Sequence, residues 1–173
     1  MTTMEDLYSL QHYRRALETV ECDPLTRSDA LHDVQLLEAR VGPTVNQAAL
    51  LFDMRTASFF PSGNAALIVF RGLRSLRWDG MPQDSKLMAF TVTSSRPRVA
   101  PTGEISFEMD FFPDGNLAVS GDCADFYLLQ VEGIPEAPPL YLERSLEHVR
   151  SDLPSWDSQC EVLQSSTLPQ AIG

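Results

Sequence analysis

Apolar side chains near the N-terminus recur at steps of three and four residues, and the charged residues of this segment fall mostly outside that stripe. Its members are Leu7, Leu10, Tyr13, Leu17 and Val20. This spacing is typical of an amphipathic helix. Glu5 and Asp6 would lie in its first turn, where the helix dipole favours acids. Pro24 stops the pattern, because the residue before a proline avoids helical dihedral angles. We therefore predict a helix over residues 4–20.

From residue 31 onward the pattern changes to short apolar runs and strict alternations, which are typical of β-strands. The expected sheet covers residues 31–132. Its strands are expected at residues 34–41, 50–55, 65–71, 86–93, 105–111, 117–119 and 125–131. The clearest alternation places four apolar residues on one face and four polar ones on the other. The apolar set is Ile105, Phe107, Met109 and Phe111, and the polar set is Glu104, Ser106, Glu108 and Asp110.

The stretch from Gln47 to Gly80 organises the expected sheet. The run from Ala65 to Arg71 is nearly all apolar, which predicts a central strand covered on both faces. Gly72 indicates a bulge or bend, after which Leu76 and Trp78 are expected to continue inward. Two further features are local: the residues Pro113-Asp114-Gly115-Asn116 predict a hairpin turn, and Arg96-Pro97-Arg98 is expected to be a loop.

The C-terminal part is expected to leave the sheet. The proline-rich run Pro135–Pro139 ends it, residues 141–150 are expected to form a short helix, and residues 151–173 an irregular tail. The predicted fold is a single α+β domain over residues 1–150, mainly β. It is an antiparallel meander sheet curled into a sandwich or partial barrel, with the N-terminal helix packed on it. Each buried aromatic would contribute roughly 1.5–3 kcal/mol. The expected aromatic core is Phe52, Phe70, Trp78, Phe107, Phe111 and Phe126.

Length and composition fit one globular domain, since the chain has 173 residues, 43% hydrophobic and 21% charged. No apolar run approaches the roughly 20 residues of a membrane helix. Acids stand near the N-terminus where a signal peptide carries basic residues, so we expect a cytoplasmic protein. Cys22, Cys123 and Cys160 lack the spacing of a metal or disulfide framework and are expected to be reduced thiols.

Charge is unevenly distributed along the chain. Residues 1–39 carry a net charge of −5, residues 40–98 carry +5 and residues 99–173 carry −11. An acidic C-terminal half would repel phosphates, which argues against nucleic acid as a partner. It is compatible with a cationic protein partner and also with simple solubility.

Two charged sets are candidates for binding. Acidic residues form the candidate partner-binding surface: Glu104, Glu108, Asp110, Asp114, Asp122 and Asp125. The alternative is an ordinary solvated sheet face. Arginines form the second set: Arg71, Arg74, Arg77, Arg96 and Arg98. They suggest an RNA-binding strip, but no aromatics are interleaved with them, so pairing with acids on neighbouring strands is the favoured interpretation.

No motif for catalysis or cofactor binding stands out. His32-Asp33 suggests a metal pair, but only His12 and His148 remain as further histidines, so we expect Asp33 to bond local backbone amides instead. The chain lacks a Gly-x-Ser-x-Gly elbow and a glycine-rich phosphate loop. We expect no catalytic residue, metal or cofactor. The alternative is a small-molecule or hydrolytic site inside the curl, built from Tyr127, Arg55 or His32, which requires an open interior. A third hypothesis is a structural subunit whose tail adds a strand to a neighbour.

Three short motifs resemble small β-rich immunity proteins of bacterial polymorphic toxin systems. They are Leu31-His32-Asp33 before a strand pair, Leu51-Phe52-Asp53-Met54-Arg55, and Phe111-Phe112-Pro113-Asp114-Gly115. The resemblance covers residues 30–132 and leaves the N-terminal helix and the tail unmatched. It implies a cytoplasmic inhibitor that binds one cognate toxin and performs no chemistry. It assigns no individual binding residue.

Overall fold

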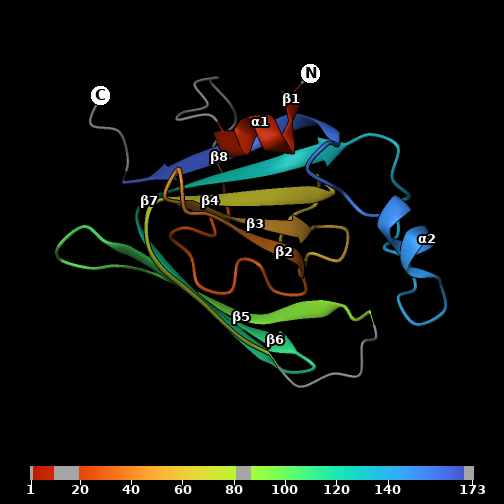
Figure 1. The fold of residues 1–173 in the computed structure, drawn as a ribbon, viewed down its shortest axis with the longest axis horizontal. Coiled ribbons are helices and arrows are strands. Elements are labelled where there is room, and N and C mark those ends of the chain that lie inside the picture. The colour runs from red at the N-terminus through yellow and green to blue at the C-terminus, as the bar shows by residue number, and fades with distance from the viewer. Residues whose placement is uncertain (1, 10–19, 81–86, 170–173) are drawn as a thin grey trace.

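A computed structural model describes residues 2–9, 20–80 and 87–169 of the chain. The described residues form a mainly β fold: an eight-stranded antiparallel sheet with a short N-terminal helix, as predicted (Figure 1). The elements in chain order are β1 (Thr2–Thr3), α1 (Met4–Ser9), β2 (Gln35–Gly42), β3 (Gln47–Asp53), β4 (Ala65–Gly80), β5 (Phe90–Val99), β6 (Ile105–Phe112), β7 (Gly115–Val131), α2 (Leu146–Ser151) and β8 (Gln159–Leu168). Among these residues, neither helix has the length and hydrophobicity needed to cross a bilayer.

The sheet curls into an incomplete ring. Its strand order is β1-β8-β7-β4-β3-β2-β5-β6, and β6 also pairs with β7. Strand β7 is 17 residues long and serves both parts of the sheet. Its first half pairs with β6 and its second half with β8, while β4 pairs with it almost throughout. The ring is weakest between β2 and β5, where only Gln35–Thr91 and Leu36–Phe90 are paired.

Strand β3, the first part of β4 (65–70) and the second part of β7 (124–129) are buried on both faces, which confirms the prediction from the apolar run at Ala65. Alternate residues of β4 enter two cores: Ile68 and Phe70 belong to the core inside the curl, whereas Leu67 and Val69 belong to the core on the opposite face. We call these the inner core and the outer core. Helix α1 covers the outer core with Leu7. Phe52, Phe70, Phe107, Phe111 and Phe126 all lie in the inner core, as expected.

Residues 20–34, which we call the interior segment, fill the space inside the curl. Figure 1 shows this segment, in orange, between β2 and β5. Its apolar side chains are buried in the inner core: Cys22, Leu25, Ala30, Leu31 and Val34. Backbone bonds tie it to β5, with Asp29 N donating to Ser95 O at 2.8 Å and Asp33 N to Val92 O at 3.0 Å. Both aspartates adopt positive φ angles, of 61° and 68°, which turn the chain sharply back toward β2.

The prediction for residues 86–98 was wrong in its boundaries. Strand β5 begins at Phe90 and continues through Pro97, which was expected in a loop, to Val99. Proline lacks an N–H group and is tolerated at a sheet edge. Beyond Phe90 and Thr91, β5 pairs with only one strand, β6, so Pro97 is accommodated. Residues 81–86, part of which belonged to the predicted strand, lie outside the described residues.

Gly72 has a φ of +60°, and the β4–β7 register shifts between Leu73 and Ser75, which confirms the predicted bulge. Trp78 was expected in the core but is 40% exposed. Its ring packs on Phe90 and Phe111, with centroids 5.2 and 5.5 Å away. Because it lies near the end of β4, it contacts the core from the rim and keeps one side in solvent.

The predicted irregular tail is wrong for Gln159–Leu168, which form β8. This strand pairs with β7 from Ala124 to Val131 and also with β1. Cys160 and Val162 are buried in the outer core, whereas Glu161 between them is exposed. The polar composition of this segment concealed that short alternation. Residues 170–173 lie outside the described residues.

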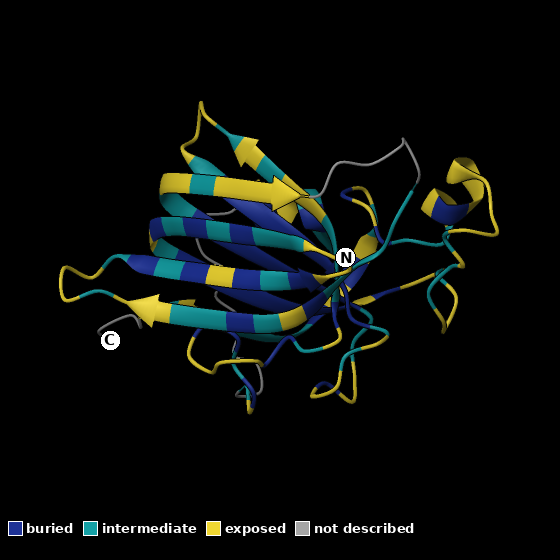
Figure 2. Ribbon diagram, turned by 90° about the horizontal axis from the view of Figure 1, so that it is seen from below, coloured by how far each residue is buried: buried dark blue, intermediate teal, exposed yellow. Residues whose placement is uncertain are grey.

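The two predicted helices are confirmed in part. Helix α1 confirms the N-terminal prediction over Met4–Ser9, and residues 10–19 lie outside the described residues. Helix α2 spans Leu146–Ser151 rather than residues 141–150. Ser145 caps it, because its hydroxyl oxygen accepts a hydrogen bond from His148 N at 3.3 Å. The chain between residues 132 and 145 is irregular and projects with α2 from one end of the molecule (Figure 2).

Candidate functional site

The interior of the curl is occupied by packed side chains rather than by a polar site. Tyr127, Arg55 and His32, the residues of the alternative internal site, do not converge there. Tyr127 belongs to the outer core, Arg55 forms a buried ion pair with Asp53, and His32 is half-exposed at the surface.

His32, Asp33 and Ser58 lie together without forming a catalytic triad. His32 Nδ1 is 3.2 Å from the Asp33 carboxylate and 3.4 Å from Ser58 Oγ, so one nitrogen makes both contacts. A triad histidine uses opposite ring nitrogens for its two partners. Ser58 Oγ donates directly to Asp33 at 2.7 Å, which replaces the local backbone bonds that were expected. No group of three His, Cys, Asp or Glu residues suited to a metal occurs among the described residues.

The three cysteines are free thiols. Burial and the nearby Asp125 raise the pKa of Cys123. Burial raises the pKa of Cys160 to about 11. Neither thiol is poised as a nucleophile at neutral pH.

The outward-facing acids of β6 are paired with an arginine of β5. Arg96 lies 3.2 Å from the Glu108 carboxylate and 2.8 Å from that of Asp110. Asn116 donates to both acids from the neighbouring strand β7. Hydrogen bonds from Arg96 and then Asn116 hold the pKa of Asp110 below its ordinary value. These two acids are therefore part of a network and do not form an isolated negative patch.

Two other acids of the predicted surface, Asp122 and Asp125, are also paired with arginines. Asp122 accepts two hydrogen bonds from Arg74, at 2.9 and 3.0 Å. Asp125 is only 3% exposed and bonds Arg71 and Thr167, so it cannot reach a partner. The predicted pairing of arginines with acids of neighbouring strands is confirmed at these positions and at Arg96. The accessible result is a mixed-charge surface that we call the charged face: Arg74, Arg96, Glu108, Asp110 and Asp122.

The charged face gives stability a modest dependence on acid pH. Because Asp110 has a lowered pKa in the folded state, its contribution is present above its unfolded pKa of about 3.8 and is lost as the pH falls through the folded value. We expect Asp110→Asn to lower the free energy of unfolding by about 1 kcal/mol or less at pH 7. That deficit should shrink below pH 4. Urea unfolding at pH 7 and pH 3 measures it, and a deficit that grows in acid would contradict it. Asp114→Asn in the exposed hairpin is the matched control.

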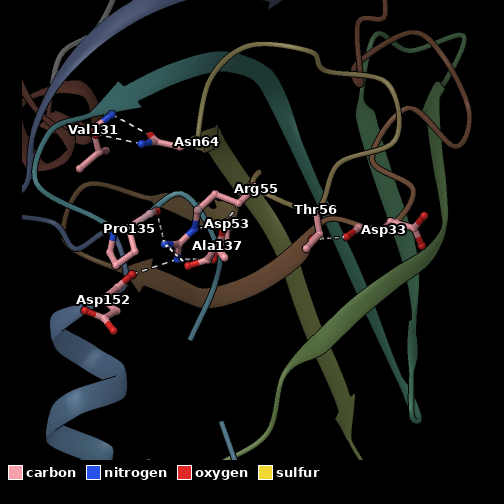
Figure 3. Close-up of polar contacts among 9 residues, drawn as sticks. All are labelled: Asp33, Asp53, Arg55, Thr56, Asn64, Val131, Pro135, Ala137 and Asp152. Atoms are coloured by element: carbon pink, nitrogen blue, oxygen red, sulfur yellow. Dashed lines mark hydrogen bonds and ion pairs between the residues drawn. The ribbon is translucent and has the colours of Figure 1, made fainter. Parts of the chain in front are cut away.

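A buried ion pair fastens the projecting chain to the sheet (Figure 3). Asp53 and Arg55 have side-chain exposures of 0% and 2%. Arg55 Nε and Nη2 donate to the two carboxylate oxygens of Asp53, at 2.9 and 2.7 Å. Nη1 donates to Pro135 O and Ala137 O, and Nη2 also donates to Asp152 O. All five N–H donors of the guanidinium are therefore used. Residues 132–158, which connect β7 to β8 and which we call the β7–β8 excursion, are held at three carbonyls by one side chain.

Further contacts fix both ends of the β7–β8 excursion. At its start, the Asn64 side chain exchanges two 2.8 Å hydrogen bonds with the backbone of Val131. At its end, Trp156 Nε1 donates to Glu38 at 2.7 Å, and Arg40 stacks 3.8 Å from a Trp156 ring centroid. Burial and the nearby Asp53 raise the pKa of Tyr141 to about 12, so its hydroxyl stays protonated. The excursion is thus anchored to the sheet near both of its ends.

The excursion presents exposed apolar side chains next to the end of β6. Phe112 is 66% exposed, Leu140 57% and Leu142 82%. With Pro113 and Pro139 they line a groove of about 500 Å³. We call these five residues the apolar tip. Clustered exposed apolar residues are typical of protein-binding surfaces. The sequence analysis did not predict this cluster, because it interpreted the proline-rich run only as the end of the sheet. The apolar residues next to those prolines were the available indication of an exposed apolar cluster.

The apolar tip and the charged face are continuous along β6. Glu108, Asp110 and Phe112 are successive outward-facing residues of this strand, while Met109 and Phe111 between them point into the inner core. A partner that contacts Phe112 would therefore also meet Arg96 and its two acids. The structure supports one candidate interface made of apolar and charged parts.

Comparison with known proteins adds little to this geometry. A scan against protein families finds none that matches the chain, and a search of curated proteins finds no similar sequence. Among solved structures, an uncharacterized protein from Neisseria gonorrhoeae is similar to this chain. The match covers 58% of this chain and 94% of the Neisseria protein. The two are 16% identical, with a TM-score of 0.41. This likeness is too distant to carry an argument about function.

Proposed function

We propose that this chain is a non-enzymatic, protein-binding inhibitor, of the kind that neutralises a bacterial toxin. The observation that carries the proposal is the filled interior: the inner core and the interior segment occupy the space where a curled sheet would otherwise hold a ligand. The sequence motifs that resemble immunity proteins give the biological setting. We therefore expect the protein to bind its partner through its outer surface.

The proposed binding surface is the apolar tip together with the charged face. An apolar centre flanked by charged residues matches the usual anatomy of a protein interface. Because Arg74 and Arg96 already pair with acids of this face, we expect it to fix the orientation of a partner rather than attract it by net charge. The net charge of −11 would speed the approach of a cationic partner from a distance.

Co-expression tests the proposal. The product of the gene directly upstream of this one is expressed in a bacterial host with and without the chain. We expect growth arrest without it, restored growth with it, and a stoichiometric complex by calorimetry. Arrest that persists despite co-expression, or the absence of a complex, would contradict the inhibitor proposal.

Substitutions on the surface test where the partner binds. Phe112→Asp and Leu142→Asp should each weaken the complex at least about tenfold, because large exposed apolar residues are the expected anchors. Val99→Asp is the matched control, since Val99 is 58% exposed but lies at the other end of β5 from the tip. Equal affinities for all three variants would remove the apolar tip from the interface.

A further inference from the structure

Strand β2 has one edge that the fold leaves largely unpaired. It pairs with β3 from Gln35 to Gly42, with a bulge at Leu37. On its other side it pairs with β5 only at Gln35 and Leu36. Beyond that point no second strand among the described residues pairs with the β5-facing side of residues 38–42, which we call the free edge.

The facing edge of β5 is bonded to the interior segment and contains a proline, whereas the free edge of β2 has only its bulge and two charged residues as protection. Asp29 of the interior segment bonds the backbone of Ser95 twice: its N–H donates to Ser95 O, and its carboxylate accepts from Ser95 N at 3.1 Å. Pro97 follows, and a proline blocks strand addition. The free edge contains no proline and no lysine. Proteins usually protect such edges or use them for pairing.

Side chains of the free edge also lack the cover that their neighbours have. Ala39 lies opposite Leu50 of β3, which is completely buried in the inner core, yet Ala39 is exposed. Val41, two residues farther on the same face, is 46% exposed. Within the described part of the chain, the curl therefore ends before it covers these positions, and a further strand can approach them.

The free edge is complementary to itself. In an antiparallel pair of two copies centred on Ala39, Glu38 lies opposite Arg40 of the second copy. Two-fold symmetry makes this pair twice. Opposite charges facing each other across two strands stabilise the pair, whereas like charges destabilise it. Any shift of register by two residues would lose both charge pairs.

Both charged side chains are held in place before any partner arrives. Glu38 accepts a hydrogen bond from Trp156, and Arg40 stacks on the Trp156 ring and also pairs with Glu5. They lie on the same face, opposite Leu51 and Ala49 of β3, which belong to the outer core. Restricting these side chains in advance lowers the entropy cost of pairing. We propose that the chain forms a symmetric dimer in which two β2 strands pair antiparallel through their free edges, centred on Ala39.

Charge reversal tests the register. We expect the chain to sediment with the mass of two chains at micromolar concentration. Glu38→Arg and Arg40→Glu should each raise the dissociation constant about tenfold or more, because each brings like charges together. An equimolar mixture of the two variants should recover a heterodimer, since arginines on one chain then face glutamates on the other. Arg77→Glu on β4 is the control and should remain dimeric.

A cross-link tests the symmetry axis without disturbing the charges. In the proposed pairing the two Ala39 Cα atoms lie within about 6 Å, which a disulfide can span. Ala39→Cys should therefore form a covalent dimer under mild oxidation, whereas Val45→Cys in the exposed β2–β3 turn should not. Monomers throughout would overturn the proposal, as would failure of the mixed variants to associate while the unmodified chain is dimeric, or equal cross-linking of both cysteine variants.

Discussion

Arg55→Met should lower the free energy of unfolding by about 3–5 kcal/mol, because it leaves a buried carboxylate without its partner. Asp53 has no exposed side-chain surface, and two of its hydrogen bonds come from the lost guanidinium. The carbonyls of Pro135, Ala137 and Asp152 lose donors at the same time. Methionine fills a similar volume, so the loss reports on charge and hydrogen bonding rather than on an empty space. Urea unfolding measures it.

Arg77→Met is the matched control for this experiment. Arg77 pairs with Asp79 at 2.9 Å, but their side chains are 71% and 62% exposed. Exposed ion pairs contribute little, so this change should cost less than about 1 kcal/mol. Hydrogen exchange should also show faster opening of residues 133–137 in Arg55→Met alone. Similar losses in the two variants would show that the buried pair does not fasten the excursion.

Leu31→Ala should lower the free energy of unfolding by about 2–5 kcal/mol, the usual range for removing a large buried aliphatic side chain. Leu31 belongs to the interior segment and is completely buried in the inner core. Its loss should open a cavity inside the curl, because the surrounding strands are held in register and can collapse only partly. The result measures how much the filled interior contributes to the fold.

Leu142→Ala makes the same chemical change at the apolar tip, where the side chain is 82% exposed. It should change the free energy of unfolding by no more than about 0.5 kcal/mol. The pair of variants therefore separates a residue that fills the interior from one that is available to a partner. Equal free energies of unfolding for the two variants would contradict a packed interior. The argument against an internal ligand site would then no longer hold.

Features of the fold that depend on local periodicity were predictable from the sequence. The alternation from Ile105 to Phe112 appears as buried and exposed residues in strict order, and Gly72 marks a real bulge. The unbroken apolar run from Ala65 to Phe70 became a strand buried on both faces. In each case the signal lies in the residues of one strand: an alternation, an apolar run or a glycine.

Features that depend on distant pairing were not predictable. Pro97 was predicted in a loop, but it lies in a strand because β5 pairs there with β6 on one side only. The polar residues of β8 were predicted to form a tail, but they form a strand because the second half of β7 pairs with them. The same reason explains the candidate site. Acids near one another in sequence looked like a negative surface, but their arginine partners come from other strands. Arg55 bonds carbonyls 80 to 97 residues away, and no local pattern announces this.

Thr2 pairs with Cys160, which the ribosome adds to the chain much later than Thr2. Met4 and Leu7 are completely buried against a surface that β7 and β8 help to build, so α1 cannot dock in its final position until residue 160 has emerged. During translation the apolar side of α1 and the outer face of β3 and β4 therefore remain exposed to solvent until then. That interval is when a nascent chain is most prone to aggregate and when chaperones bind it.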